Sequence, residues 1–253
     1  MFGSERKKIV RLHFAIIGAQ KSGTTALHYL LEKHPNIVLG DQQEMHFFDN
    51  ETIFLKPPDY ELLHRHFPAL PASAVAGDCT PSYLYWKPAA ERIRQYNPAI
   101  KLLALLRNPI DRAFAHWNMQ RFKGREPLAF LDAIKEETNR IAPPLSIESR
   151  RFSYVDRGFY TEQLEQFLKL FPREQLKIIK FEEFRDHQLE TMNAIFHFLG
   201  VKPIKTVRSK DRNVVPYERE MTTKERKDLY DVFAEEILKV ERLLGWDCSD
   251  WKL

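Results

Sequence analysis

The chain has 253 residues, of which 43% are hydrophobic, and a formal net charge of +4 that results from 39 basic and 35 acidic residues. This hydrophobic content suffices for a packed core and excludes a disordered chain, while the small charge excess excludes a surface coated with positive charge. The two cysteines, Cys79 and Cys248, are too few for a disulfide framework and lack the spacing of metal ligands.

Two features bear on location and domain organisation. The N-terminal charges precede a short apolar run that ends at Gly18 without a small-residue cleavage site, so we interpret this run as a strand and not as a signal peptide. The sequence contains no stretch of about 18 consecutive apolar residues. We therefore expect a cytoplasmic protein without membrane or nucleic-acid partners, built as a single domain over residues 1–253.

The elements predicted in the first half of the chain alternate between strands and helices. The apolar run at 12–17 predicts a strand, and leucines at helical spacing within 24–34 predict the helix that follows. Residues 74–76 and 100–106 predict two further buried strands. Apolar spacing predicts additional helices at 89–96, 110–121 and 127–140.

The second half continues this alternation. A helix at 159–171 precedes a strand at 176–180, and Thr222 with Glu225 forms the capping box expected at the start of a long closing helix. Two segments are expected to be irregular and to line a substrate entrance: 52–73 and 141–156. Because strands that alternate with helices favour a parallel sheet, we predict an α/β fold of three layers, with helices flanking a central, mostly parallel sheet.

The turn at 18–25 joins the first predicted strand to the first predicted helix, where backbone N–H groups and the helix dipole favour an anion. Lysine and hydroxyl side chains add donors for phosphate-like oxygens. The turn is P-loop-like but differs from the loop of nucleoside triphosphatases. That loop ends in Gly-Lys-Ser/Thr, whereas here Lys21 precedes Ser22 and Gly23. An ordinary surface loop with an N-cap at Thr24 is the simpler alternative. The candidate anion-binding residues are Gln20, Lys21, Ser22, Gly23, Thr24 and Thr25.

Three further basic residues are candidates for anion contacts. Arg107 directly follows the predicted strand at 100–106. A nucleoside triphosphatase more often carries a metal-binding aspartate there, whereas an arginine indicates that an anion is bound. The alternative is a surface arginine paired with Asp111. Lys210 and Arg212 lie in a basic loop before the closing helix, although loops of this composition are often only solvated.

An acid–base segment lies at 44–49. If the segment is extended, Glu44 and His46 lie on one face, beside apolar Phe47 and Phe48. A glutamate in such surroundings suits a general base, and a neutral imidazole can also accept a proton, so both residues are candidates for this role. A core turn with a hydrogen-bonded histidine is the alternative without function.

These motifs together resemble the sulfotransferases that use 3′-phosphoadenosine-5′-phosphosulfate, above all the glycosaminoglycan-type and bacterial branches, over roughly residues 12–251. The resemblance implies that Lys21 contacts the phosphosulfate and helps the leaving oxygen, and that Arg107 holds the 3′-phosphate. It implies that the loop with Lys210 and Arg212 covers the nucleotide. It also implies that Glu44, in the motif Glu-x-His-Phe-Phe-Asp, is the catalytic base. The candidates for substrate contacts are His46, Asp49 and Tyr83, and for Tyr83 a core position is an equal alternative to stacking on a sugar or phenol.

Two positions depart from the family pattern. Ala115 stands where the family has a serine that holds the 3′-phosphate, which removes one expected hydroxyl contact. Cys79 replaces a lysine that helps to bind anionic sugars or the transferring sulfuryl group, which weakens the case for a polyanionic acceptor. We expect Cys79 to be a buried small residue and not a nucleophile.

The resemblance thus implies a metal-independent enzyme that transfers a sulfuryl group by in-line displacement to a hydroxyl or amine of a small-molecule or carbohydrate acceptor. A nucleotide-dependent kinase is the rival enzyme class, because it uses a similar phosphate loop together with magnesium. A nucleotide-sensing or nucleic-acid-binding module is the rival without catalysis. No motif identifies the acceptor, the choice between O- and N-sulfation, or the oligomeric state.

Overall fold

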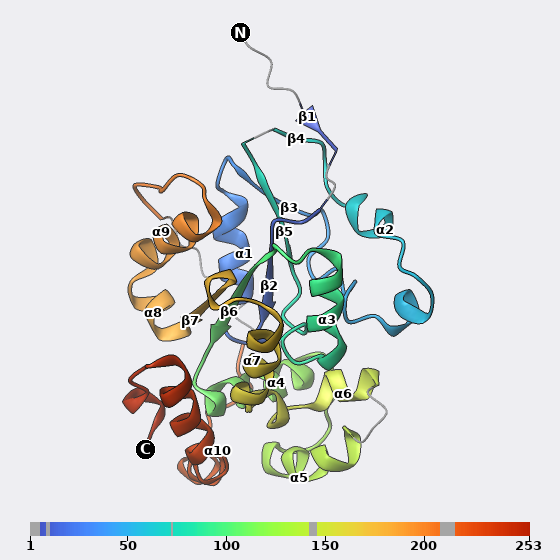
Figure 1. Ribbon diagram of the computed structural model, residues 1–253. Helices are drawn as coiled ribbons and strands as arrows, with labels where there is room; N and C mark the ends of the chain where they lie inside the picture. Colours follow the sequence, from blue (N-terminus) through green and yellow to red (C-terminus); the bar gives the residue numbers. More distant parts are fainter. Residues whose placement is uncertain (1–5, 9–10, 72, 142–145, 208–215) are drawn as a thin grey trace. The chain divides into compact units, whose positions relative to one another are not determined.

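The computed structural model describes residues 6–8, 11–71, 73–141, 146–207 and 216–253 (Figure 1). The chain divides into two compact units, which are described separately. The first comprises Met1–Ala19, Gly23–Leu105 and Gln166–Arg212, and the second comprises Gln20–Ser22, Leu106–Glu165 and Asn213–Leu253. The single domain expected over 1–253 stays a prediction.

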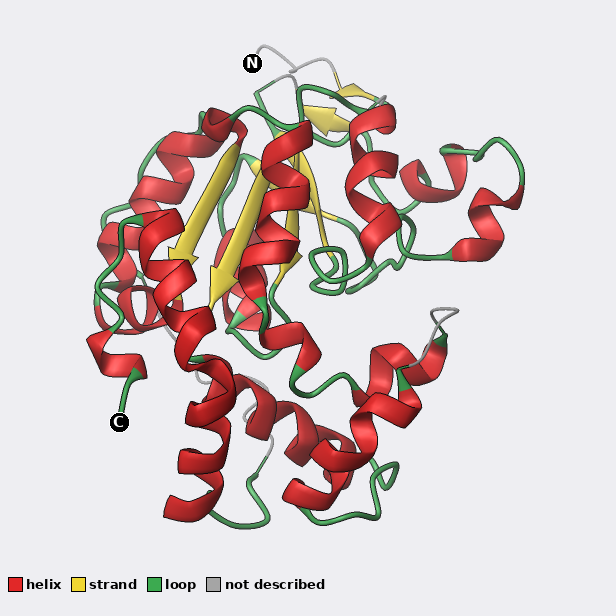
Figure 2. Ribbon diagram, turned by 60° about the horizontal axis from the view of Figure 1, so that its bottom comes forward, coloured by secondary structure: helices red, strands yellow, loops and turns green. Residues whose placement is uncertain are grey.

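A five-stranded sheet forms the centre of the first unit, and its strands appear in yellow in Figure 2. Its order is β3-β5-β2-β6-β7, and β2 pairs in parallel with both β5 and β6, as β3 does with β5. The strands are β2 (Phe14–Gly18), β3 (Ile37–Leu39), β5 (Val75–Cys79), β6 (Lys101–Leu106) and β7 (Leu176–Lys180). Parallel pairing brings the carboxyl ends of β2, β5 and β6 to one edge of the sheet.

Helices cover both faces of this sheet. On one face, α1 (Thr24–Glu32), α8 (Phe181–Asp186) and α9 (Gln188–Leu199) bury an apolar cluster against β2 and β6. The strand residues that alternate with this cluster face the other way and are also buried, on the side of α3 (Lys87–Tyr96) (Figure 1). The Tyr96 hydroxyl accepts a hydrogen bond from the Leu12 amide at 2.6 Å, which fixes the end of α3 near the start of β2. The predicted α/β fold with a mostly parallel central sheet is confirmed.

Shorter elements complete the first unit. They are the antiparallel pair β1 (Arg6–Lys7) and β4 (Leu70–Pro71), and the short helices η1 (Glu51–Leu55), α2 (Glu61–His64) and η3 (Arg173–Gln175). The segment expected to be irregular at 52–73 therefore contains one turn of α-helix and one strand of the small sheet. Residues 44–49 lie in the connection that follows β3, and residues 80–83 lie in the connection that follows β5.

The second unit is helical. It contains α4 (Pro109–Phe122), α5 (Phe130–Arg140), α6 (Ile147–Phe152), η2 (Asp156–Gly158), α10 (Thr223–Leu244) and η4 (Ser249–Trp251), while α7 (Tyr160–Leu170) passes from this unit into the first. The predicted capping box is present, since Thr222 accepts a hydrogen bond from the Glu225 amide and Glu225 accepts one from the Thr222 amide. Within the described ranges, no helix combines the length and apolar character needed to cross a bilayer. The cytoplasmic location stays a prediction.

Candidate active site

The turn between β2 and α1 has the backbone of an anion-binding turn. Lys21 and Gly23 have positive φ angles of 70° and 88°, and α1 begins at Thr24 without a side-chain cap and without an acidic residue in its first turn. The first N–H groups of a helix need a partner, and an anion supplies one. Within the described part of the chain, the buried Ser22 hydroxyl and the Gln20 side-chain oxygen have no hydrogen-bond partner.

Glycine is required at both ends of this turn. A Cβ added at Gly18 would lie 2.6 Å from Leu84 Cβ, and one added at Gly23 would lie 2.8 Å from the Phe181 ring. Both distances are shorter than a carbon–carbon contact allows, so any larger residue would move the turn. Tight packing of this kind is consistent with the predicted P-loop-like turn.

Arg107 lies beside Lys21 within the second unit. Its Nη1 donates a hydrogen bond to the Lys21 carbonyl at 3.4 Å, and its own carbonyl accepts one from the Tyr160 hydroxyl at 2.8 Å. Asp111, the alternative partner considered for Arg107, forms an ion pair with Arg226 at 2.6 Å. The structure therefore places the Arg107 guanidinium beside the backbone of Lys21, the other cationic residue that the resemblance assigns to the donor.

The surroundings of His116 show that positive charge gathers in this unit. Burial lowers the pKa of His116 well below its ordinary value, and the charges of Arg112, Arg157 and Lys21 lower it further. The residue before His116 on α4 is Ala115, which is buried and stands where the family has a serine. Lys210 and Arg212, the other two predicted cofactor contacts, lie outside the described residues.

The acid–base segment is not extended, which corrects the geometry assumed from the sequence. Glu44 and His46 have φ angles of 54° and 51°, and together with Lys21 they are the only non-glycine residues with positive φ in the described ranges. This left-handed backbone places Glu44 Oε2 at 3.5 Å from His46 Nε2. Sparsely populated backbone conformations cost free energy and concentrate at functional sites.

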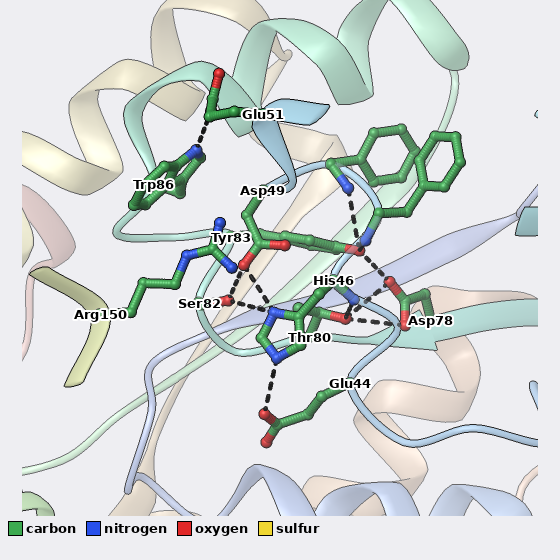
Figure 3. A network of polar contacts seen from close by, with 12 residues as sticks. Glu44, His46, Asp49, Glu51, Asp78, Thr80, Ser82, Tyr83, Trp86 and Arg150 are labelled. Atoms are coloured by element: carbon green, nitrogen blue, oxygen red, sulfur yellow. Dashed lines mark hydrogen bonds and ion pairs between the residues drawn. The ribbon is translucent and has the colours of Figure 1, made fainter. Parts of the chain in front are cut away.

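His46 also bonds to a carboxylate on its other side (Figure 3). Its Nδ1 lies 2.9 Å from Asp49 Oδ2, and the Ser82 hydroxyl donates to the same oxygen. Although burial lowers the pKa of His46, the hydrogen bonds with Asp49 and Glu44 raise it, and the net pKa is about 9. His46 is therefore mainly an imidazolium at neutral pH, a form that does not accept a proton. The Glu44 side chain is 44% exposed.

Tyr83 and Asp49, both predicted to contact substrate, are completely buried. The Tyr83 hydroxyl donates to Asp78 at 2.6 Å and accepts from the Phe47 amide at 3.1 Å. This engagement favours a role behind the site and does not favour a contact with an acceptor. Sequence reasoning missed Asp78 and Ser82, although a polar residue at the end of a buried strand, as Asp78 is, was a usable signal.

Cys79 is buried, as expected. Burial raises the pKa of its thiol well above the ordinary value, and the neighbouring Asp78 and Glu44 raise it further, so the thiol stays protonated. Its Sγ lies 3.9 Å from the Thr24 carbonyl, against the first turn of α1. A protonated, buried thiol is a poor nucleophile.

Comparisons with known proteins point to one family. A model of the sulfotransferase domain matches residues 11–242. Over 209 residues the chain is 31% identical to heparan sulfate glucosamine 3-O-sulfotransferase 5 of Homo sapiens, an alignment that covers 79% of the chain and 59% of that relative. It is 29% identical over 211 residues to bifunctional heparan sulfate N-deacetylase/N-sulfotransferase 2 of Homo sapiens, covering 79% of the chain and 23% of the relative. The chain thus spans 59% of the first of these curated relatives and 23% of the second, less than two thirds of either.

A solved structure agrees over almost the whole chain. The sulfotransferase from Alicyclobacillus acidocaldarius superposes with a TM-score of 0.81 at 29% sequence identity, covering 96% of this chain and 99% of that one. Similarity at this level shows that the two chains share one fold over almost their whole length.

Proposed function

The chain belongs to the sulfotransferase domain family, and we propose that it transfers a sulfuryl group from 3′-phosphoadenosine-5′-phosphosulfate to a hydroxyl or amine of a small-molecule or carbohydrate acceptor. The observation that carries this proposal is the uncapped start of α1, preceded by Lys21 and the buried, unpartnered Ser22 hydroxyl. An anion satisfies all of these groups at once.

The donor's two anionic groups have separate candidate partners. The start of α1, Lys21 and Ser22 would hold the phosphosulfate, and Arg107 would hold the 3′-phosphate. The hydrogen bond from Arg107 to the Lys21 carbonyl supports a common ligand, because it places the guanidinium beside the turn that would hold the phosphosulfate. Removal of a well-placed hydrogen-bond donor at a developing charge raises the activation free energy by about 2.7–4 kcal/mol, so Lys21 would contribute substantially to the rate enhancement.

The transfer itself needs one base. The acceptor atom forms a bond to sulfur while the bond between sulfur and the bridging phosphate oxygen breaks, and the electron pair leaves with that oxygen. Glu44 takes the acceptor's proton. The exposed Glu44 carboxylate beside a protonated His46 supports this assignment over His46 as base. His46 would hold Glu44 in place and supply positive charge near the transferring group.

Two observations bear on the class of acceptor: the names of the curated relatives and the absence of charge on the Cys79 thiol. The two curated relatives named above carry heparan sulfate in their names, which supports a carbohydrate acceptor. Cys79 brings no charge to the end of β5, since its thiol is buried and protonated. An acceptor with few negative charges therefore fits this chain better than a polyanionic chain does.

Ligand-induced stabilisation tests the proposal. Adenosine 3′,5′-bisphosphate should raise the Tm without magnesium, by a stabilisation of roughly 2.7 kcal/mol at a ligand concentration of 100 Kd. The purified protein should then move labelled sulfate from the donor to an acceptor in a panel of sugars and phenols. A Tm that rises only with ATP and magnesium would instead identify a kinase, and binding to DNA or RNA with steep salt dependence would identify a nucleic-acid module.

A further inference from the structure

The backbone of the acid–base segment is held by the connection that follows β5. The Glu44 amide donates to the Cys79 carbonyl at 3.2 Å, and the His46 amide donates to Thr80 Oγ1 at 3.4 Å. The next two amides, of Phe47 and Phe48, both donate to the Tyr83 hydroxyl, at 3.1 and 3.5 Å. Four N–H groups of this short segment are therefore bound by residues 79–83.

The hydroxyls of Thr80 and Tyr83 both donate hydrogen bonds to one carboxylate, that of Asp78 (Figure 3). The Tyr83 hydroxyl donates to Asp78 Oδ2 at 2.6 Å, and Thr80 Oγ1 donates to the two Asp78 oxygens at 3.1 and 3.2 Å. A carboxylate only accepts, so it fixes the direction of both O–H bonds. Each hydroxyl then turns its lone pairs toward the N–H groups of the segment.

The burial and charge of Asp78 suit it to hold the hydroxyls of Thr80 and Tyr83 in fixed orientations. It is 1% exposed and lies next to the last residue of β5, in a strand that pairs with both β2 and β3. Burial raises its pKa to about 6, against the lowering effect of the bonds from Tyr83 and Thr80, so at neutral pH the carboxylate form prevails. Burial, and then the charge of Asp78, raise the pKa of Tyr83 well above its ordinary value, so its hydroxyl keeps its proton.

We propose that Asp78 is a positioning residue that acts through Thr80 and Tyr83 to hold the left-handed backbone on which Glu44 meets His46. Two left-handed non-glycine residues so close together persist only where their surroundings fix them. The hydrogen bonds from consecutive amides supply that constraint. The effect of Asp78 on turnover rests on the proposed function, whereas its effect on the geometry of Glu44, His46 and Asp49 does not.

The test combines an electrostatic measurement with kinetics. The variants are Tyr83→Phe, Asp78→Asn, and the pair Thr80→Val and Thr80→Ser. The pKa of the His46 imidazole is measured by NMR titration, with its signal assigned by its loss in His46→Gln. Turnover and the Kd of adenosine 3′,5′-bisphosphate are measured in parallel, and circular dichroism establishes that each variant is folded.

Tyr96→Phe is the matched control. Tyr96 is also a buried tyrosine of the first unit whose hydroxyl accepts a backbone N–H, that of Leu12, and its ring packs 5.3 Å from the Phe48 ring. The change removes a hydroxyl of the same kind without touching an amide of the acid–base segment. General loosening of the unit would affect both tyrosine variants alike.

In Tyr83→Phe, Asp78→Asn and Thr80→Val we expect the His46 pKa to fall from about 9 toward its ordinary value of 6.5, because His46 loses its fixed distance to Asp49 and Glu44. Turnover should fall roughly 10- to 100-fold, as for a misplacement of about 1 Å, with the nucleotide Kd unchanged. Thr80→Ser and Tyr96→Phe should keep both properties.

An unchanged His46 pKa in folded Tyr83→Phe and Thr80→Val would overturn the proposal, and so would an equal fall in Tyr96→Phe. If Asp78→Asn does not fold, these two variants still decide the question. Absence of sulfuryl transfer in the unmodified protein would refute the proposed function alone, because the imidazole titration does not depend on activity.

Discussion

His46 Nδ1 donates a hydrogen bond to Asp49 Oδ2 at 2.9 Å, and the accepting carboxylate is completely buried. A buried carboxylate is poorly solvated, so it interacts strongly with a positive charge held against it. The second carboxylate, Glu44, lies on the opposite side of the same ring. The two carboxylates, one at each ring nitrogen, keep the imidazole protonated. Of the two candidate bases left open by the sequence, this arrangement favours Glu44.

Turnover should depend on pH through His46. Its pKa is about 9, so the imidazolium persists at neutral pH and is lost as the pH rises through 9. We expect kcat to fall above that pH. In Asp49→Asn the imidazole loses one carboxylate partner, its pKa drops, and the fall in kcat should begin at lower pH.

The same profile discriminates between the two candidate bases. If neutral His46 were the base, kcat would increase with pH up to about 9 and Asp49→Asn would be more active near neutrality. The measurement is a kcat–pH profile from pH 6 to 10, at saturating donor and acceptor, for both proteins.

Glu44→Gln should abolish most of the turnover. The amide has nearly the same shape as the carboxylate but does not accept a proton, and loss of general-base catalysis typically costs about 100- to 10,000-fold. The Kd of adenosine 3′,5′-bisphosphate should not change, since Glu44 is assigned to the acceptor. Glu165→Gln, on the exposed surface of α7, is the control for loss of a carboxylate. Normal turnover in Glu44→Gln would remove Glu44 from the mechanism.

Lys21→Ala should lower kcat by roughly 100- to 1,000-fold, as for removal of a donor to a developing charge. Arg107→Ala should instead weaken donor binding, because Arg107 is assigned to the 3′-phosphate. Its readout is the ratio of Kd values for adenosine 3′,5′-bisphosphate and adenosine 5′-phosphate. The assignment of Arg107 requires that ratio to approach one in the variant.

The places of Lys21 and Arg107 in the fold could be predicted from the sequence for a simple reason, while their contacts with the donor stay a prediction. Lys21 and Arg107 follow the ends of apolar strands, and parallel strands place such positions at one edge of the sheet. β3 was missed because it has only three residues, Ile37–Leu39, too few for a pattern. The capping box at Thr222 and Glu225 was recognised because its two residues are near in sequence.

The geometry of the acid–base segment could not be predicted from the sequence. An extended segment would place Glu44 and His46 on one face, yet they meet through a left-handed backbone. The reason lies in partners far away in the sequence: Ser82 bonds to Asp49 across 33 positions, and Tyr83 to Phe47 across 36. No local pattern reports such contacts, so the supporting residues became visible only in three dimensions.

Glu137→Ala should destabilise the second unit. Glu137 is buried on α5 and accepts the Val155 amide at 2.8 and 3.0 Å and the Asp156 amide at 2.8 Å. Alanine would leave these two amides without their acceptor, and each such loss costs about 1–3 kcal/mol. Glu137→Gln keeps one acceptor oxygen and should cost less. Urea unfolding of both variants measures the difference, and equal stability of the two would refute this assignment.

Cys79→Ala should leave turnover within about twofold of the unmodified protein, since the proposed displacement uses no covalent enzyme intermediate. The thiol is also buried and kept protonated by its surroundings, so alkylation by iodoacetamide at pH 8 should be slow in the native state and fast in urea. A burst of labelled sulfate that stays on the protein and disappears in Cys79→Ala would contradict direct transfer. Absence of such a burst would support direct transfer of the sulfuryl group, a step in which Lys21, Glu44 and the charge on His46 are the assigned groups.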